Sequence, residues 1–265
     1  MDKKTVLLFI PVLFCFSISI AQAPGNSNAP GKKPLVDGEQ GYGAPKKKGL
    51  RYKSLFVPAF MIAYGITANN SDALKDINEE VKDEFWIERF HKKTSIDNYL
   101  QFAPAVAVYA LNLAGVKGKH DLIDRSLIFL MSNLFLNTSV VALKNISHVE
   151  RPDGSAFNSF PSGHTTEAFA SAEFMRQEYK DVSPWYGVAG YAAATATGIL
   201  RVYNNKHWLS DVVGGAGIGI LSTKLAYWLY PVIKRTLFKK PRTHTMLMPY
   251  YRGSAAGLSL VYTIH

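Results

Sequence analysis

Features that would point to several other kinds of protein are scarce in this 265-residue sequence. Its single cysteine, Cys15, excludes an internal disulfide framework. Acidic residues are few, 20 against 30 lysines and arginines, and the resulting formal charge of +10 indicates an anionic partner. A basic stripe with interleaved aromatic residues is missing, so nucleic acid is not favoured as that partner. The basic residues cluster at the ends of apolar segments, which favours an anionic lipid surface instead.

The central part of the chain also lacks the alternating pattern of strands and any fixed-period repeat, and its apolar segments have the length of helices. These segments span 100–116, 126–143, the residues after Pro161, 184–200 and 209–233, with a shorter one at 55–68. Short polar connections join them, which favours antiparallel neighbours. The sequence therefore predicts an all-α fold, an antiparallel helical bundle of about five to six core helices within 51–240.

Both ends of the chain differ from this bundle. Residues 1–23 have a charged start, a short apolar run and an A-x-A ending, which is typical of a secretory signal peptide; an uncleaved anchor helix is the alternative. Residues 24–50 are rich in proline, glycine and lysine and predict a flexible basic linker that tethers the bundle. In the tail, 241–265, apolar residues alternate with small or polar ones, which predicts one terminal strand or an extended arm.

Three short polar blocks stand at the ends of the apolar segments. In chain order they are Lys144 with Arg151-Pro152, then Pro161-Ser162-Gly163-His164, and then Arg201 with His207 and Asp211. Because each block begins or ends a predicted helix, we expect the polar side chains to gather at one rim of the bundle.

This set of side chains fits a tetrahedral oxyanion such as phosphate. Lys144, Arg151 and Arg201 supply positive charge for its oxygens, and arginine offers a planar fork that matches phosphate geometry. Ser162 and Gly163 lie at a predicted helix start, where a hydroxyl and backbone N–H groups face an anion. The sequence thus predicts a phosphate-binding site built from these five residues.

Two histidines and an aspartate complete the predicted site. His207 and Asp211, at i and i+4, share a helix face, so the carboxylate can hold one ring nitrogen and leave the other free to attack phosphorus. His164 remains as the proton donor. These three residues could also ligate a metal, but the three neighbouring cations would repel a divalent ion, so we predict a site without a metal.

The spacing of the blocks resembles that of the type-2 phosphatidic acid phosphatase family, which is related to vanadium haloperoxidases and bacterial acid phosphatases. The family pattern K-x6-RP, PSGH and SR-x5-H-x3-D is matched over roughly residues 100–231. One position departs from the pattern, because Leu200 stands where the family has a serine before the arginine of the third block.

The resemblance implies a metal-independent phosphatase without a cofactor that hydrolyses a lipid phosphate through a phosphohistidine intermediate. His207 is then the nucleophile, Asp211 holds its ring, and His164 protonates the leaving alkoxide and afterwards activates water. Lipid A phosphate, undecaprenyl pyrophosphate and phosphatidic acid all fit as substrates. A soluble periplasmic non-specific acid phosphatase would use the same residues and is the alternative. No protein partner can be inferred.

The location follows from counting membrane crossings. The apolar segments are just long enough to span a bilayer, which predicts a protein of the inner membrane of a cell envelope. If a signal peptide exports the chain, the rim faces the periplasm only when one segment does not cross, and we expect the short segment 55–68 to lie flat. Lys117, Lys119 and the basic residues after 233 then stay inside, in agreement with the positive-inside rule. A soluble periplasmic bundle satisfies the same count.

Overall fold

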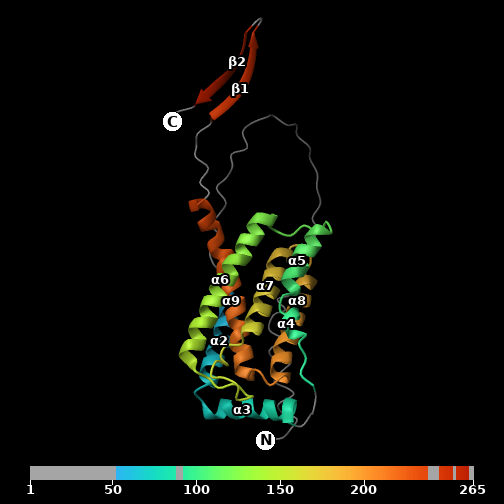
Figure 1. Cartoon of the computed structure of the whole chain (residues 1–265), viewed down its shortest axis with the longest axis vertical. Coiled ribbons are helices and arrows are strands. Elements are labelled where there is room, and N and C mark those ends of the chain that lie inside the picture. Colours follow the sequence, from blue (N-terminus) through green and yellow to red (C-terminus); the bar gives the residue numbers. More distant parts are fainter. Residues whose placement is uncertain (1–51, 88–91, 238–244, 253–254, 263–265) are drawn as a thin grey trace, which may run out of the picture.

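A computed structural model describes residues 52–87, 92–237, 245–252 and 255–262 of the chain, and most of these residues are helical (Figure 1). The α-helices are α2 (Phe56–Ala68), α3 (Asp72–Lys82), α4 (Asp97–Leu100), α5 (Ala103–Leu113), α6 (Leu122–Ser147), α7 (Gly163–Tyr179), α8 (Pro184–Tyr203) and α9 (Leu209–Leu237). A 3-10 turn, η2 (Tyr52–Leu55), precedes α2, and a short π-helical turn, η3 (Asp83–Ile87), follows α3. The predicted all-α bundle is confirmed.

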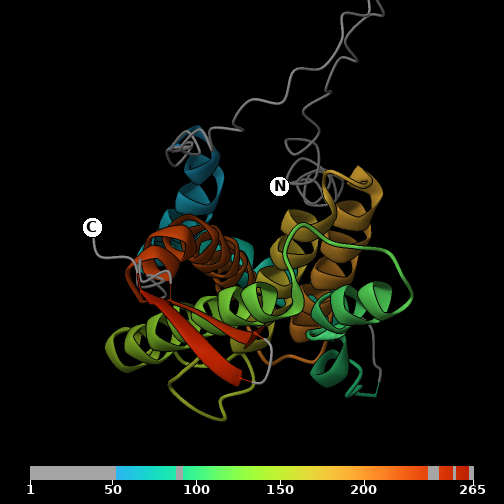
Figure 2. The ribbon, with the colours of Figure 1, turned by 90° about the horizontal axis from the view of Figure 1, so that it is seen from above.

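Helix α7 is the centre of this bundle. It packs against α8 and α9 most extensively, and against α5 and α6 on its other side, while α2 packs on the outer side of α9 (Figures 1 and 2). The amino end of α7 lies at the same end of the bundle as the carboxyl ends of α6 and α8 and the amino end of α9. We call this end, the lower one in Figure 1, the rim, and the opposite end the far end.

Small residues let the helices approach α7 closely. A side chain at Gly219 of α9 would place its Cβ 2.2 Å from the carbonyl oxygen of Thr166, and one at Gly190 of α8 would meet the backbone of Ala172 at 3.4 Å. Backbones this close are in direct van der Waals contact at these positions. The glycines in the predicted segments 184–200 and 209–233 therefore serve the close packing that the sequence indicated.

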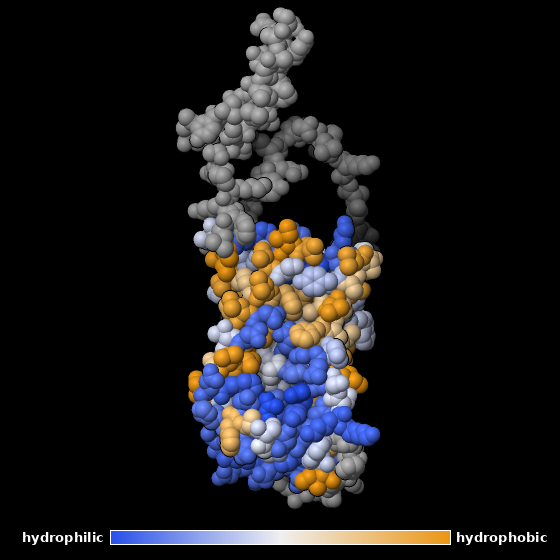
Figure 3. All heavy atoms as spheres, in the orientation of Figure 1, coloured by the Kyte–Doolittle hydropathy of each residue, from blue (hydrophilic) through white to orange (hydrophobic). Residues whose placement is uncertain are grey.

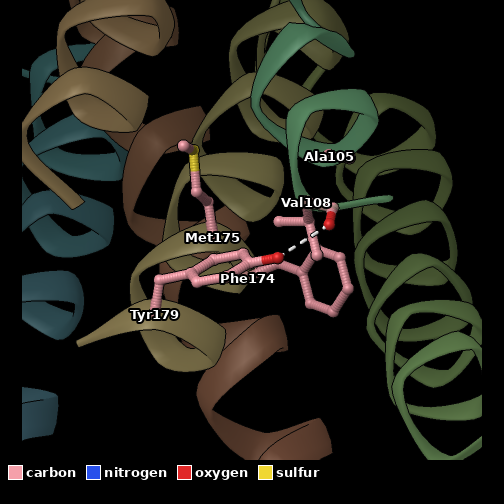
Figure 4. Close-up of a cluster of buried hydrophobic side chains, with 5 residues drawn as sticks. All are labelled: Ala105, Val108, Phe174, Met175 and Tyr179. Atoms are coloured by element: carbon pink, nitrogen blue, oxygen red, sulfur yellow. Dashed lines mark hydrogen bonds between the residues drawn. The ribbon is translucent and has the colours of Figure 1, made fainter. Parts of the chain in front are cut away.

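Aromatic and aliphatic side chains hold α5 to α7 toward the far end. Val108 of α5 is fully buried against Phe174 and Tyr179 of α7, and the Tyr179 hydroxyl donates to the carbonyl oxygen of Val108 at 2.9 Å (Figure 4). The hydroxyl needs this acceptor because it is buried.

Two carboxylates of α7 are also buried toward the far end, and both are paired. Glu173 accepts from Arg176 at 2.6 Å and from the Tyr191 hydroxyl at 2.6 Å, and Glu178 accepts from the Tyr227 hydroxyl at 2.6 Å. Buried charges persist when their hydrogen-bonding capacity is met in this way. Neighbouring helices therefore shield the charged residues of α7, although the helix itself is not apolar.

Helix α2 does not lie flat. It packs lengthwise and antiparallel along α9, where Gly217 lies against the carbonyl oxygen of Pro58 and Gly214 lies against Gly65. These two glycines of α9 leave room for a neighbouring backbone, which the crossing count did not consider. The predicted flat placement of 55–68 is wrong. Because α2 runs from the far end toward the rim, the count of crossings that put the rim in the periplasm no longer holds.

Helix α3 crosses the rim at a steep angle to the other helices (Figure 1). Its Asn78 side chain donates to the Ser210 hydroxyl at 2.9 Å and accepts from the Ser210 backbone N–H at 3.0 Å, and all these groups are buried. This double hydrogen bond fastens α3 to the first turn of α9, next to the predicted site.

The two strands follow the bundle. β1 (Thr245–Arg252) and β2 (Ala255–Tyr262) form an antiparallel pair in which Thr245 lies opposite Tyr262. The tail is thus a two-stranded hairpin, whereas the sequence predicted one strand or an extended arm. The signal peptide predicted for 1–23 and the linker predicted for 24–50 lie outside the described residues.

The outer surface of the bundle is apolar toward the far end and hydrophilic at the rim (Figure 3). Helices α6 and α9 are long and apolar enough to cross a membrane by length and composition. Every helix around α7 exposes large apolar side chains, for example Phe60 of α2, Val106 of α5, Leu134 of α6, Trp185 of α8 and Val232 of α9. So large an exposed apolar surface is typical of proteins that contact lipid or a partner.

Candidate active site

The antiparallel bundle brings the three polar blocks together at the rim. Lys144 lies in the last turn of α6, Arg201 in the last turn of α8, and Asp211 in the first turn of α9. His164 lies in the first turn of α7, and His207 lies two residues before α9. Residues separated by up to 67 positions in the sequence thus meet at one end of the fold, as predicted.

His207 is held by its Nδ1 side. Nδ1 lies 3.5 Å from Oδ2 of Asp211 and 3.5 Å from the Ser159 hydroxyl, and both His207 and Asp211 are buried. The carboxylate is itself fixed, since Oδ2 accepts from the Ser159 hydroxyl at 2.5 Å and from the Trp208 backbone N–H at 2.9 Å. Because Nδ1 faces the carboxylate, Nε2 is the ring nitrogen that can act as a nucleophile.

The loop between α6 and α7 positions two of the cations through Asn158. Lys144 Nζ donates to the carbonyl oxygen of Asn158, and Arg151 Nε donates to its Oδ1 at 2.9 Å. The loop is fixed in turn by hydrogen bonds from the Arg151 backbone N–H to Ala156 and from the Ser159 N–H to Val149, each at 2.9 Å. Asn158 therefore ties the first block into a single unit.

Arg201 is oriented by an acidic residue from outside the three blocks. Its Nη1 donates to Oδ2 of Asp97 at 2.6 Å, and both side chains are nearly buried. The Nε of Arg201 is buried without a hydrogen-bond partner among the described residues. Asp97, on α4, thus holds the guanidinium that follows Leu200, where the family pattern has a serine.

The second block forms the start of α7. The Ser162 hydroxyl caps the helix by accepting from the Thr165 backbone N–H at 3.4 Å, and it lies 2.9 Å from the Thr165 hydroxyl. Ser162 is fully buried, and its side chain serves as the helix cap. The sequence suggested instead that this hydroxyl contacts phosphate. Space beside Gly163 is open, because an added Cβ would meet nothing within 4 Å. An anion could approach the helix amino end there.

His164 makes its hydrogen bond to another residue of α4. Its Nε2 lies 2.8 Å from Oδ1 of Asn98, and an amide oxygen only accepts, so Nε2 carries the proton. His164 thus lies on the rim side of α7, near Asp97 and Arg201, with its Nε2 proton held by Asn98.

Burial and the cations shift both histidines toward the neutral form. Burial lowers the pKa of His207 to about 4, with Arg201 and Lys144 acting in the same direction and Asp211 against it. Burial also lowers the pKa of His164, and the charge of Arg201 adds to the effect. A buried imidazole is more costly to charge than one in water, and nearby positive charge raises that cost further. His207 is consequently a free base at neutral pH, as a nucleophile must be.

The loops around the site are clamped to each other. Lys206 Nζ donates to Asp153 at 2.7 Å, and the Trp208 indole N–H donates to the carbonyl oxygen of Glu150 at 2.7 Å. Asp153 therefore pairs with Lys206 rather than with its neighbour Arg151. The clamp keeps the first block against the third.

Sequence reasoning missed four residues of this arrangement, namely Asp97, Asn98, Asn158 and Ser159. Two of them lie close to the predicted blocks, so their nearness to Pro161 was a usable signal. Asp97 and Asn98 lie more than 40 positions before Lys144. Their one signal was an acidic and an amide residue at the start of the apolar segment 100–116, on the side where a helix would begin at the rim.

A protein-family match covers the three polar blocks. The model of the PAP2 superfamily matches residues 125–235, which include all eight residues of the predicted site. The chain belongs to the PAP2 superfamily. Asp97 and Asn98 lie before the matched segment, so this PAP2 site is completed by residues outside it.

Among the relatives of this PAP2 chain is the lipid A 1-phosphatase of Porphyromonas gingivalis, which is 32% identical over 244 residues. The match covers 89% of this chain and 52% of the relative, so the chain spans about half the relative's length. A crystal structure of a transmembrane PAP2-type phosphatidylglycerolphosphate phosphatase from Bacillus subtilis is 20% identical, with a TM-score of 0.46 over 68% of this chain and 98% of that one. A crystal structure of Aquifex aeolicus LpxE is 19% identical, with a TM-score of 0.45 over 57% of this chain and 94% of that one.

Proposed function

We propose that this protein is a membrane-embedded, metal-independent phosphatase that hydrolyses a lipid phosphate through a phosphohistidine. The observation that carries the proposal is the pair of His207 and Asp211, in which Nδ1 lies 3.5 Å from the carboxylate and Nε2 makes no hydrogen bond to a described residue. Arg201 and Lys144 are near enough for their charges to act on the His207 ring. Phosphoryl transfer needs this combination of a nucleophile and fixed positive charge.

In the first step Nε2 of His207 attacks phosphorus, and the bond from phosphorus to the leaving oxygen breaks. His164 gives its Nε2 proton to that oxygen, so the lipid alcohol leaves neutral. Lys144, Arg151 and Arg201 hold the three equatorial oxygens, and the backbone N–H groups at Gly163 face the same charge.

In the second step water attacks the phosphohistidine. His164, now neutral, takes a proton from the water while the bond from phosphorus to Nε2 breaks, which releases inorganic phosphate and restores His207. Asp211 stabilises the charge on the His207 ring in both steps through its contact with Nδ1. Every proton in the cycle is accounted for by these residues, so the scheme needs no metal ion.

The exposed apolar surface of α2, α5, α6, α8 and α9 supports a place in the bilayer, since the bundle would otherwise hold that surface in water. The distribution of charge supports an active site on the side away from the cytoplasm. Lys117, Lys119, Lys180, Lys234 and Arg235 lie at or beyond the far end, and short loops rich in lysine and arginine stay inside.

The relative's name makes the 1-phosphate of lipid A the first substrate to test. Purified protein in detergent should release phosphate from this lipid, and EDTA should leave the rate unchanged. His207→Ala and His164→Ala should each lower kcat by at least about 1,000-fold without loss of folding. His148→Asn is the matched control, because His148 is exposed near the site and its φ of 45° suits asparagine.

The intermediate can be tested separately. Substrate labelled with ³²P at the phosphate should label the wild-type protein in an acid-labile, base-stable form after rapid quenching, and His207→Ala should carry no label. Label that persists in His207→Ala, or full activity of that variant, would contradict the assignment. Activity that disappears in EDTA and returns with zinc would contradict the metal-free mechanism. A protein that stays in the aqueous fraction when membranes are separated would support the soluble alternative.

A further inference from the structure

A second polar feature leads from the catalytic residues into the bundle. On α6, Asn133 and Asn137 lie 11 and 7 residues before Lys144, so the three side chains share one helix face. On α7, Glu167 and Ser171 lie three and seven residues after His164 and share a face in the same way. We call Asn133, Asn137, Glu167 and Ser171 the polar stripe.

The polar stripe lies on the side of α7 that α5 and α6 flank, where Ser171 is fully buried and Glu167 nearly so. Helices α5 and α6 both pack on α7 but make few contacts with each other over the described part of the chain. In Figure 1 α7 is visible between them, and in Figure 3 hydrophilic surface extends from the rim over this same face. The polar stripe therefore begins beside the residues that would hold the phosphate and continues along this side of α7.

Glu167 is the unusual member of the polar stripe. Its side chain is only 7% exposed, and its Oε1 has no hydrogen-bond partner among the residues that the structure describes. Asn133 and Ser171 lie beside its carboxyl group, but Asn133 donates to the carbonyl oxygen of Phe129 at 3.2 Å, and the buried Ser171 hydroxyl is itself unpartnered. Groups of this kind are costly to bury unless a ligand satisfies them.

The other carboxylates of α7 show that this is a specific property of the position. Glu173 and Glu178 are buried more completely, yet each accepts from several donors on neighbouring helices. The fold therefore supplies donors to buried carboxylates wherever their role is structural. Glu167 alone of the three keeps a free acceptor, and it is also the one nearest His164.

Position decides what the free acceptor meets. His164 gives its proton to the leaving oxygen, so the alcohol that carries this oxygen lies beside His164. Glu167 is one helical turn farther in, about 5 Å along the axis. An N–H or O–H group a few bonds from the leaving oxygen would lie close enough to donate a hydrogen bond to Glu167. The ester carbonyls of a diacylglycerol can only accept hydrogen bonds, so they could not pair with the Glu167 carboxylate.

We propose that Glu167 is a specificity residue, whose Oε1 accepts a hydrogen bond from an N–H or O–H group of the leaving alcohol. It selects an acylated amino-sugar phosphate, which has an amide N–H next to the phosphate-bearing carbon, over a diacylglycerol phosphate. This inference rests on the proposed phosphatase function and deepens it by naming the class of leaving group.

A cavity elsewhere in the bundle does not compete for this role. It has a volume of about 590 Å³, and residues of α2, α6 and α9, including Ile62, Leu134 and Ser222, line it. Its α6 residues lie on the face of the helix opposite Lys144 and Asn137. A chain extending from the catalytic residues would have to pass around α6 to enter it.

The test compares two substrates in the same detergent micelles, lipid A 1-phosphate and dioleoyl phosphatidic acid. The quantity measured is the ratio of their kcat/KM values. Glu167→Leu should lower the preference for lipid A about tenfold, because the amide donor loses its acceptor. Glu167→Gln keeps an amide oxygen as acceptor and should retain part of the preference. Ser222→Leu, a polar-to-apolar change in the cavity, is the control and should keep the wild-type ratio.

Three results would overturn the proposal: a ratio within twofold of wild type in Glu167→Leu, an equal loss on both substrates, or a wild type that prefers phosphatidic acid. If Glu167→Leu does not fold, as judged by its thermal unfolding, the ratio of kcat/KM values in Glu167→Gln is used instead. A preference for lipid A that is unchanged in Glu167→Gln would then overturn the proposal. Failure of the underlying function looks different, because wild type would then release phosphate from neither lipid.

Discussion

The contact between Asp97 and Arg201 allows a quantitative prediction, because it links the site to a helix outside the family pattern. Asp97→Asn keeps the size of the side chain and one acceptor oxygen but removes the charge that faces Nη1 of Arg201 at 2.6 Å. Both side chains are at least nine-tenths buried, so solvent screens the pair little. A hydrogen bond to a charged partner contributes about 1.5–3 kcal/mol.

If Asp97 orients the guanidinium toward the equatorial oxygens, the same energy is lost from the transition state. At about 1.4 kcal/mol for each factor of ten, kcat/KM should fall roughly 10- to 100-fold. The assay is phosphate release from the lipid substrate, with thermal unfolding as the measure of folding. Asp181→Asn makes the identical change at an exposed position near the far end and should leave the rate within twofold of wild type.

The opposite result has a clear meaning. Asp97 also places negative charge close to where an anionic substrate binds. If this repulsion outweighs the orientation of Arg201, Asp97→Asn will bind phosphate more tightly and react faster. An increase in kcat/KM, or no change beyond that of Asp181→Asn, would refute the orienting role.

Three further predictions concern the catalytic residues themselves. The nucleophile His207 must be neutral, so kcat/KM should fall as the pH drops below about 4. His164 must be protonated, so kcat/KM should also fall as the pH rises past the lowered pKa of His164. The pH optimum of the free enzyme should therefore be acidic. A pH profile with a neutral or alkaline optimum in kcat/KM would contradict this assignment. Ser159→Ala removes the shorter of the two hydrogen bonds to Asp211 Oδ2 and should lower kcat at least about tenfold while KM changes little, in steady-state kinetics. Vanadate should inhibit competitively, because its trigonal-bipyramidal form matches the transition state, and indifference to vanadate would argue against the arrangement of cations.

The proposed catalytic core could be predicted because its geometry is largely local. His207 lies in the turn just before α9, four residues from Asp211 in its first turn, and the serine and glycine before His164 are contiguous with it, so their relation depends only on short-range spacing. Antiparallel packing then needs only short loops to bring the three blocks to one end. Lys144, Arg151 and Arg201 meet the histidines for that reason.

The remaining features depend on packing between distant segments, for which this single sequence holds no local signal. Asp97 reaches Arg201 only because α4 packs beside the end of α8, and Asn98 reaches His164 because α4 also contacts α7. The direction of α2 depends on glycines of α9 that admit a second backbone, and counting charges and crossings does not reveal such a fit. The sequence indicated that a helix begins at Ser162. The direction of its hydroxyl depends on the contact with Thr165, which the sequence did not indicate.

Helix α3 has a consequence for how the enzyme would sit in a bilayer. It lies across the bundle axis, turns Leu74, Ile77 and Val81 toward the other helices, and exposes acidic residues on its outer face. In the proposed membrane placement this helix would rest among the lipid headgroups and keep the bundle from sinking deeper. The reacting phosphate would then stay at its natural depth, so that a lipid could be dephosphorylated without being lifted out of its leaflet.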